Sequence, residues 1–134
     1  MALPDDGDRK VSDGEFFSVE FAVKSSSRMA SAWSWMQEVD ERTLMAFMRL
    51  FDRVAETGII HDETVLKRLD GDVWEFKRPG TRVLCVRHGN RFLLTNVLKK
   101  SGRKNISSDI ASAKSIGEEH LKWEASRIQK LKNH

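Results

Sequence analysis

Residues 73–98 read "VWEFKRPGTRVLCVRHGNRFLLTNVL", the part of the chain with the clearest strand pattern. Three runs rich in apolar and β-branched residues are separated by two short breaks, "RPG" and "HGN", and each break carries a glycine. Period-two alternation bounded by glycine turns is typical of β-hairpins. The stretch therefore predicts three adjacent antiparallel strands, at residues 73–77, 81–87 and 91–98.

The third of these strands leads directly into a dense group of positive charges, Lys99, Lys100, Arg103 and Lys104. Residues 67–104 hold 11 basic and 3 acidic residues, whereas the whole chain carries a net charge of only +3. Such a concentration favours a polyanionic partner, with a solvated basic surface as the alternative. Cations also alternate with apolar residues along the strands. If the apolar positions face the helices, we expect many of these cations to project from the other face or from strand ends, and that face to be basic and concave. The residues that we expect to bind nucleic acid are Lys77, Arg82, Arg87, Lys99, Lys100, Arg103 and Lys104.

Two helices are expected before this stretch. Residues 40–58, "DERTLMAFMRLFDRVAETG", place apolar side chains three and four positions apart, which is the spacing of one helix face. Asp40 can cap the start of this helix, and Gly58 can end it in the left-handed conformation. Phe47 and Phe51 fall on the apolar face, so both are expected to be buried. A shorter helix is expected in the preceding segment, "ASAWSWMQEV".

The two ends of the chain complete the predicted architecture. Residues 1–15 form a polar leader whose order the sequence leaves open, and a single domain is expected over residues 16–134. That domain opens with a strand at Phe16–Val23 and closes with a helix that starts near Ser107 and is interrupted or hinged at Gly117. The fold class is therefore α+β: an N-terminal strand, a helical hairpin, a three-strand antiparallel meander forming a twisted sheet, and a C-terminal helix.

Composition excludes several classes of protein. With 40% hydrophobic and 32% charged residues, the chain has the composition of a globular domain, and no apolar run is long enough to span a membrane. Residues 1–15 are too polar and acidic for a secretory signal, and the lone Cys85 has no partner for an intramolecular disulfide. We therefore expect a cytoplasmic protein in which Cys85 is a small buried residue. No set of cysteines and histidines has metal-ligand spacing, so neither a metal nor another cofactor is expected.

A succession of motifs extends over roughly residues 16–121. After the helical hairpin come a leucine and a glycine turn, followed by an aromatic residue, a glutamate, an apolar residue and a cation. A strand that begins with arginine, an apolar strand followed by paired lysines, and a helix complete the succession. These places are held by Leu69, Gly71, Trp74, Glu75, Phe76, Lys77, Arg82, Lys99, Lys100, Ile110 and Ala113. In order and spacing the motifs resemble the RelE/ParE superfamily of bacterial toxins, in particular its HigB-like or phage-derived Gp49-like branch.

The resemblance implies a RelE-like fold, with two helices packed on a twisted antiparallel sheet. It also implies the toxin of a type II toxin–antitoxin system, with a cognate antitoxin protein as partner and, in many members, cleavage of mRNA on the ribosome. The chain departs from the family pattern because it contains no tyrosine. Cys85 and Val97 stand where relatives often carry Tyr and Phe, and the proline that usually follows the lysine pair is missing.

A metal-independent ribonuclease must move protons at the 2′-hydroxyl and at the leaving oxygen, and it must stabilise negative charge on the phosphate. We expect Arg82 and Lys99, with Lys100, to supply the positive charge. Among the four histidines, His120 is the acid–base candidate, because the resemblance places it at the end of the last helix that relatives bring back beside the lysines. The predicted catalytic residues are therefore His120, Lys99 and Arg82, on one concave face.

Two alternatives are open. The first is a non-catalytic protein of the same fold that binds nucleic acid or a protein target such as gyrase, and the absence of tyrosine favours it. The second is an inactive phage-derived member that keeps the fold and an antitoxin-binding groove without toxicity. A histidine close to two lysines on one face of the structure would favour the nuclease.

Overall fold

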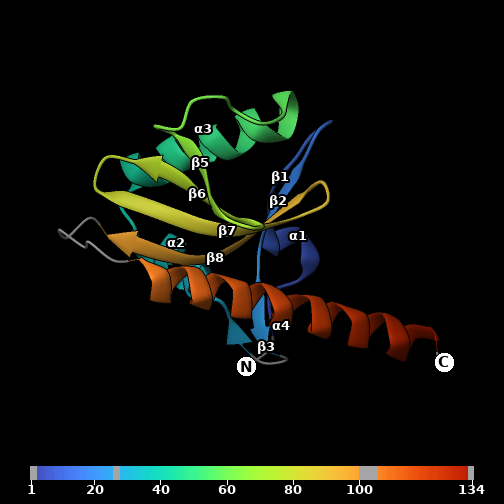
Figure 1. Cartoon of the computed structure of the whole chain (residues 1–134). Coiled ribbons are helices and arrows are strands. Elements are labelled where there is room, and N and C mark those ends of the chain that lie inside the picture. The colour runs from blue at the N-terminus through green and yellow to red at the C-terminus, as the bar shows by residue number, and fades with distance from the viewer. Residues whose placement is uncertain (1–2, 26–27, 100–105, 133–134) are drawn as a thin grey trace.

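The computed structural model of the chain describes residues 3–25, 28–99 and 106–132, which form an α+β fold around one mixed sheet (Figure 1). The sheet has six strands in the order β1-β2-β8-β7-β6-β5. Their bounds are β1 Lys10–Asp13, β2 Ser18–Phe21, β5 Leu66–Asp70, β6 Val73–Arg78, β7 Thr81–His88 and β8 Arg91–Lys99. A separate pair of short strands, β3 Val23–Ser25 and β4 Arg28–Met29, follows β2. The helices are α1 Asp6–Arg9, α2 Ser31–Glu38, α3 Glu41–Thr57 and α4 Ser107–Lys132.

The predicted antiparallel meander is confirmed. β6 pairs with β7, and β7 pairs with β8, both in antiparallel register. Each connecting turn contains a glycine at positive φ, Gly80 at 80° and Gly89 at 61°, a conformation that glycine adopts at no steric cost. The register places Arg82 opposite Lys77 on one side and opposite Leu98 on the other.

The sheet is larger than the three predicted strands. β5 pairs antiparallel with β6, and at the other side β2 pairs with β8 in parallel register, starting with Ser18 opposite Arg91. The strand expected at Phe16–Val23 is thus shorter than predicted, and it joins the sheet beside β8. β1 pairs with β2 at the edge, so the part of the polar leader that forms β1 belongs to the same sheet.

The leader is also tied to the last helix. Arg9 donates hydrogen bonds to the carbonyl of Pro4 and to the carboxylate of Asp6, and Arg127 on α4 donates to the same carboxylate at 3.2 Å. The guanidinium groups of Arg9 and Arg127 also lie over the ring of Trp123, 4.8 and 4.6 Å from its centroid. These contacts hold α1 against α4, although Asp6 and Arg127 are 121 residues apart in the sequence.

The long helix before the meander begins and ends as the sequence predicts. Asp40 accepts a hydrogen bond from the backbone N–H of Thr43 at 3.0 Å and so caps α3. Gly58 ends the helix with a positive φ of 92°, but its ψ of −166° is extended and not left-handed helical. Phe47 and Phe51 are fully buried, which confirms the predicted apolar face. Both belong to the core that α2 and α3 form with one face of the sheet.

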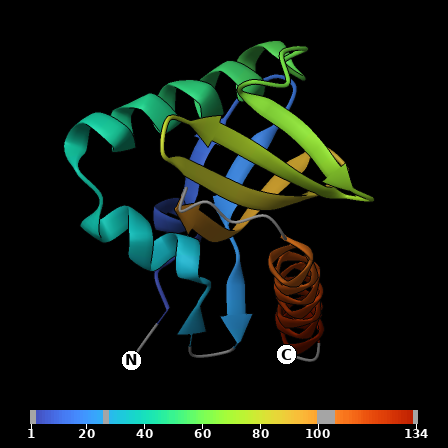
Figure 2. The ribbon, with the colours of Figure 1, turned by 60° about the vertical axis from the view of Figure 1, so that its left-hand side comes forward.

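The other face of the sheet is covered by α4, which Figure 2 shows nearly end-on, on the opposite side of the sheet from α3. Ala113 of this helix packs in one cluster with Leu84, and Ile116 packs in another with Leu93. Because successive side chains of a strand point to opposite faces of the sheet, β7 and β8 place apolar residues on this face as well as on the face that packs against α2 and α3. The prediction of an open basic face is wrong, because α4 covers that face. Lys77 and Arg82 lie at strand ends, which was the other place expected for the cations.

α4 runs through Gly117 without interruption, so the predicted hinge is wrong. The glycine is required for close packing: a Cβ added there would lie 2.9 Å from Cγ2 and 3.2 Å from Cβ of Val86 on β7. The helix can therefore approach the sheet more closely at this position than any side chain would permit. Neither α4 nor another helix within the described residues is long and apolar enough to cross a membrane.

Gly117→Ala should lower the free energy of unfolding by about 1–2 kcal/mol, because the cost of forcing a methyl group into a packed contact exceeds what alanine gains over glycine within a helix. Urea denaturation of the variant and the wild type measures the difference. Ser112→Ala, at an exposed position of the same helix, is the control and should change stability by less than about 0.5 kcal/mol. A Gly117→Ala protein as stable as the wild type would show that α4 does not rest on Val86.

Candidate nucleic-acid interface

Positive charge gathers at the end of the sheet where β6 ends, β7 begins and β8 ends. β6 closes with Lys77 and Arg78, and β7 opens with Thr81 and Arg82. Because Thr81 pairs with Lys99, the last residue of β8, the lysine cluster seen in the sequence leaves the sheet at this same end. Three members of that cluster, Lys100, Arg103 and Lys104, lie outside the described residues. We call Lys77, Arg78 and Arg82 the basic end.

A buried carboxylate lies beneath two of these cations. Glu75 on β6 is only 1% exposed, with Oε1 3.4 Å from Nζ of Lys77 and Oε2 3.6 Å from Nη1 of Arg82. Both distances exceed those of a well-formed hydrogen bond, and Oε2 has no hydrogen-bond partner among the residues described. Lys77 and Arg82 are themselves partly exposed. The carboxylate therefore attracts both cations and leaves their N–H groups available to an anion.

A hollow of about 360 Å³ opens beside the turn between β6 and β7. The residues that line it include Lys77, Arg78 and Arg82, together with Thr64 and Thr81. No carboxylate from the described part of the chain lines it. Its electrostatic potential therefore favours a negatively charged ligand.

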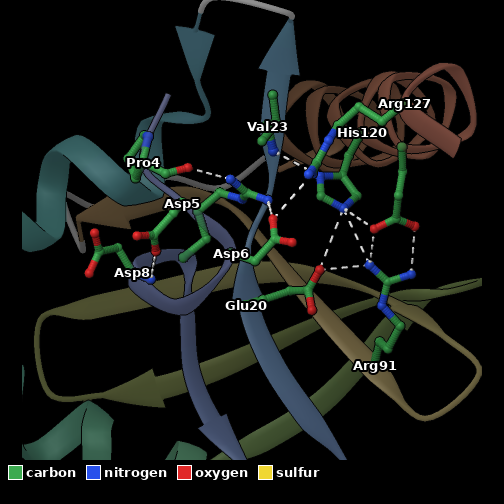
Figure 3. A network of polar contacts seen from close by, with 11 residues as sticks. Pro4, Asp5, Asp6, Asp8, Glu20, Val23, Arg91, His120 and Arg127 are labelled. Atoms are coloured by element: carbon green, nitrogen blue, oxygen red, sulfur yellow. Dashed lines mark hydrogen bonds and ion pairs between the residues drawn. The ribbon is translucent and has the colours of Figure 1, made fainter. Parts of the chain in front are cut away.

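His120 occupies a different part of the molecule (Figure 3). The side chain is 1% exposed, and its Nδ1 accepts a hydrogen bond from the backbone N–H of Val23 at 2.9 Å. Because Nδ1 is the acceptor, the proton of the neutral ring is on Nε2. Nε2 lies 3.4 Å from Oε2 of Glu124 and 3.6 Å from Oε1 of Glu20, so this proton is directed toward two carboxylates.

Arg91, at the start of β8, completes this group. Its guanidinium forms hydrogen bonds of 2.8 and 2.6 Å with Glu124 and one of 2.6 Å with Glu20. Burial alone would raise the pKa of Glu20, but the contacts with His120 and Arg91 outweigh it and lower the pKa to about 2. The hydrogen bonds from Arg91 also lower the pKa of Glu124. We call Glu20, Arg91, His120 and Glu124 the Arg91 network, and it joins β2, β8 and α4.

The Arg91 network offers three ligand atoms, from Glu20, His120 and Glu124, within 4.8 Å of one another, which is a spacing that a metal ion could use. Two observations speak against a metal there. The guanidinium of Arg91 already contacts both carboxylates. In addition, Nε2 of His120 carries the proton that a metal-binding nitrogen must lose. The residues fit an arginine, whose guanidinium forms hydrogen bonds with both carboxylates.

The structure does not bring His120 to the cations it was expected to meet. Arg91, which contacts His120, begins β8, whereas Arg82 pairs with Leu98 near the other end of that strand. At 3.4 Å per residue, the strand between Arg91 and Leu98 is about 24 Å long. The predicted approach of His120 to Arg82 and Lys99 is therefore wrong, because α4 brings His120 against the start of β8.

Two further predictions concern β7. Arg87, expected to bind nucleic acid, lies toward the end of β7 that is remote from Arg82, with its guanidinium 5.0 Å from the ring centroid of Phe17 and 5.9 Å from that of Trp74. It stacks on aromatic residues of its own chain and is not part of the basic end. Cys85 is fully buried, as predicted, and burial raises the pKa of its thiol. A buried thiol of this kind is a poor nucleophile.

No protein-family model matches the chain, and no curated protein sequence matches it either. The function is therefore argued from the side chains that the fold brings together.

Sequence reasoning missed the place of Glu75 beneath the cations, although a carboxylate inside an otherwise apolar strand was a signal for it. It also missed Glu20, Arg91 and Glu124 as partners of His120, and no local pattern connects these residues.

The lowered pKa of Glu20 makes the stability of the fold depend on pH. Ionised Glu20 stabilises the folded state above its ordinary pKa of 4.5, and this contribution is lost as the pH falls from 4.5 toward 2. We expect Glu20→Gln to be less stable than the wild type at neutral pH by about 1–3 kcal/mol, with a flatter profile in that acid range. Urea denaturation at several pH values measures both effects. Glu56→Gln, exposed on α3, is the control, and parallel profiles for Glu20→Gln and the wild type would contradict the assignment.

Proposed function

We propose that this protein is the toxin of a type II toxin–antitoxin pair, a ribosome-associated endoribonuclease of the RelE/HigB-like type that cleaves mRNA without a metal. The observation that carries the proposal is the arrival of Lys77, Arg82 and the end of β8 at one end of the sheet. The phosphates of single-stranded RNA attract such a group of cations. The proposal includes a cytoplasmic location and a cognate antitoxin as partner.

In this proposal the cations act on the scissile phosphate. The 2′-hydroxyl of the RNA is the nucleophile, and negative charge accumulates on the phosphate in the transition state. Arg82 and Lys77 bind the non-bridging oxygens and stabilise that charge, while Lys99 and Lys100 extend the contacts along the RNA backbone. Glu75 lies beneath the first two cations and limits the freedom that they lose when RNA binds.

His120 has a structural role in this proposal. A general acid or base must come within hydrogen-bond distance of the reacting oxygen. His120 is buried, both of its ring nitrogens face groups of the protein, and it lies at the opposite end of β8 from Arg82. Both proton transfers are therefore assigned to water at the basic end, where one water molecule accepts the proton of the 2′-hydroxyl and another donates a proton to the departing 5′-oxygen. The Arg91 network holds α4 on the sheet.

A second candidate is a non-catalytic protein of the same fold that binds nucleic acid or a protein target such as gyrase, or an inactive phage-derived member. Two observations favour it: the histidine expected beside the cations lies elsewhere, and the chain has no tyrosine. The basic end would then serve binding alone. The two candidates differ in whether RNA is cut.

Controlled expression in bacteria tests the proposal. The wild-type chain should arrest growth and generate new mRNA ends, and Lys77→Ala/Arg82→Ala should slow cleavage by about 10²–10³-fold, because it removes the groups that stabilise the transition state. Lys130→Ala is the matched control, since it removes an exposed lysine from the last turn of α4, far from the end of β8 (Figure 1). Growth curves and sequencing of mRNA ends give the readouts.

RNA binding by the purified proteins separates the two candidates. A wild type that binds RNA but neither arrests growth nor cuts message supports the second candidate. In both cases the double variant should bind with a weaker salt dependence, the slope of log K against log salt falling by about 1–2. Equal cleavage and an equal salt slope in the wild type and the double variant would mean that the basic end does not meet RNA.

A further inference from the structure

The hollow beside the β6–β7 turn has the features of a ligand site in its own right. Its volume of about 360 Å³ lies near the lower end of the range for small-molecule sites, roughly 300–1,000 Å³. It is formed by two segments, the turn itself and the loop before β5 that contains Thr64 and Val65. The backbone N–H of Lys77 donates to the carbonyl of Val65 at 2.8 Å, so the two walls are fixed to each other.

The charged groups of the hollow select an anion. Lys77, Arg78 and Arg82 all line it. Among the residues that the structure describes, the acid in contact with two of them is Glu75, which is buried beneath and is not part of the lining. Nε of Arg78 is buried and makes no hydrogen bond within the described residues. A buried donor without a partner is costly, and a bound oxygen would satisfy it.

The uncharged groups select a ligand that also carries hydroxyl groups. The hydroxyl of Thr64 donates to Oδ1 of Asp62 at 2.6 Å, so it presents its lone pairs, as an acceptor, to any neighbour. Thr81 is a second residue with a hydroxyl group among those that line the hollow. Val65 and Pro79 supply a small apolar surface that a sugar ring can cover. A phosphate ion alone would leave these groups unused.

We propose that this hollow binds a single ribonucleotide, with its phosphate against Lys77, Arg78 and Arg82 and a ribose hydroxyl donating to Thr64. Lys77, Arg78 and Arg82 carry three positive charges and Glu75 carries one negative charge, so the net charge at this place matches that of a phosphate monoester, about −2. The volume of about 360 Å³ is of the size expected for a small ligand. The inference rests on the proposed function and deepens it, because it assigns the place where one nucleotide of the RNA is held beside the basic end.

Isothermal titration calorimetry on the full chain tests the inference without any cleavage. The probes are the four ribonucleoside 5′-monophosphates, the matching nucleosides and inorganic phosphate. At least one monophosphate should bind ten times more tightly than its nucleoside and than inorganic phosphate. Arg78→Gln should weaken that binding about tenfold, the effect expected for one charge-assisted hydrogen bond. Lys130→Gln, at the far end of α4, is the matched control and should bind as the wild type does.

The outcomes separate this inference from the proposed function. If the folded wild type binds none of the four monophosphates, the inference is overturned whatever the growth assay shows. Phosphate binding as tight as the monophosphates overturns it too, because the hollow would then be an anion site only. Undiminished binding in a folded Arg78→Gln protein places the nucleotide elsewhere, and Arg82→Gln serves the same purpose if the first variant does not fold. Nucleotide binding that Arg78→Gln weakens, in a chain that is not toxic, upholds the inference and refutes the toxin.

Discussion

The position of β8 is the constraint on which the rest of the structure depends. β8 lies between β2, its parallel partner, and β7, its antiparallel partner, and both of its faces are buried. Phe92 and Leu94 face the core beneath α2 and α3, whereas Leu93 and Leu98 belong to the clusters beneath α4. A strand buried on both faces has a nearly continuous apolar sequence, as "FLLTNVL" has. Its direction places one polar cluster at its start and a different one at its end.

The two ends of β8 differ in their balance of charge. At the start, two carboxylates share one guanidinium through short hydrogen bonds, and a buried histidine faces them. Such a group stabilises the fold, and because one guanidinium faces two carboxylates while the histidine is neutral, it has no excess of positive charge for an anion. At the other end, the single buried carboxylate of Glu75 lies beneath Lys77 and Arg82, and the hollow beside them has cations and no acid in its described lining. We assign binding to this end because its positive charge exceeds what the protein itself neutralises.

Local patterns in the sequence predicted the parts of the fold that depend on local contacts. The spacing of apolar residues and the glycines at the turns predicted the meander, the limits of α3 and the burial of Phe47 and Phe51. The register of the β6–β7 hairpin brings Lys77 and Arg82 together. The parallel pairing of β2 with β8 and the cover that α4 gives the second face were missed, since neither has a local signal. The role of His120 was misjudged for the same reason: its partner Val23 is 97 residues away in the sequence.

The central claim is that RNA meets the end of β8 at Lys99 and not its start at Arg91. The most direct measurement is mapping of amide chemical shifts by NMR while a short single-stranded RNA is added to the full chain. The account predicts perturbations concentrated at Thr64, Lys77 and Arg82, with the amides of Arg91 and His120 unchanged. Perturbations centred on Arg91 and His120, with none at Lys77 and Arg82, would contradict it.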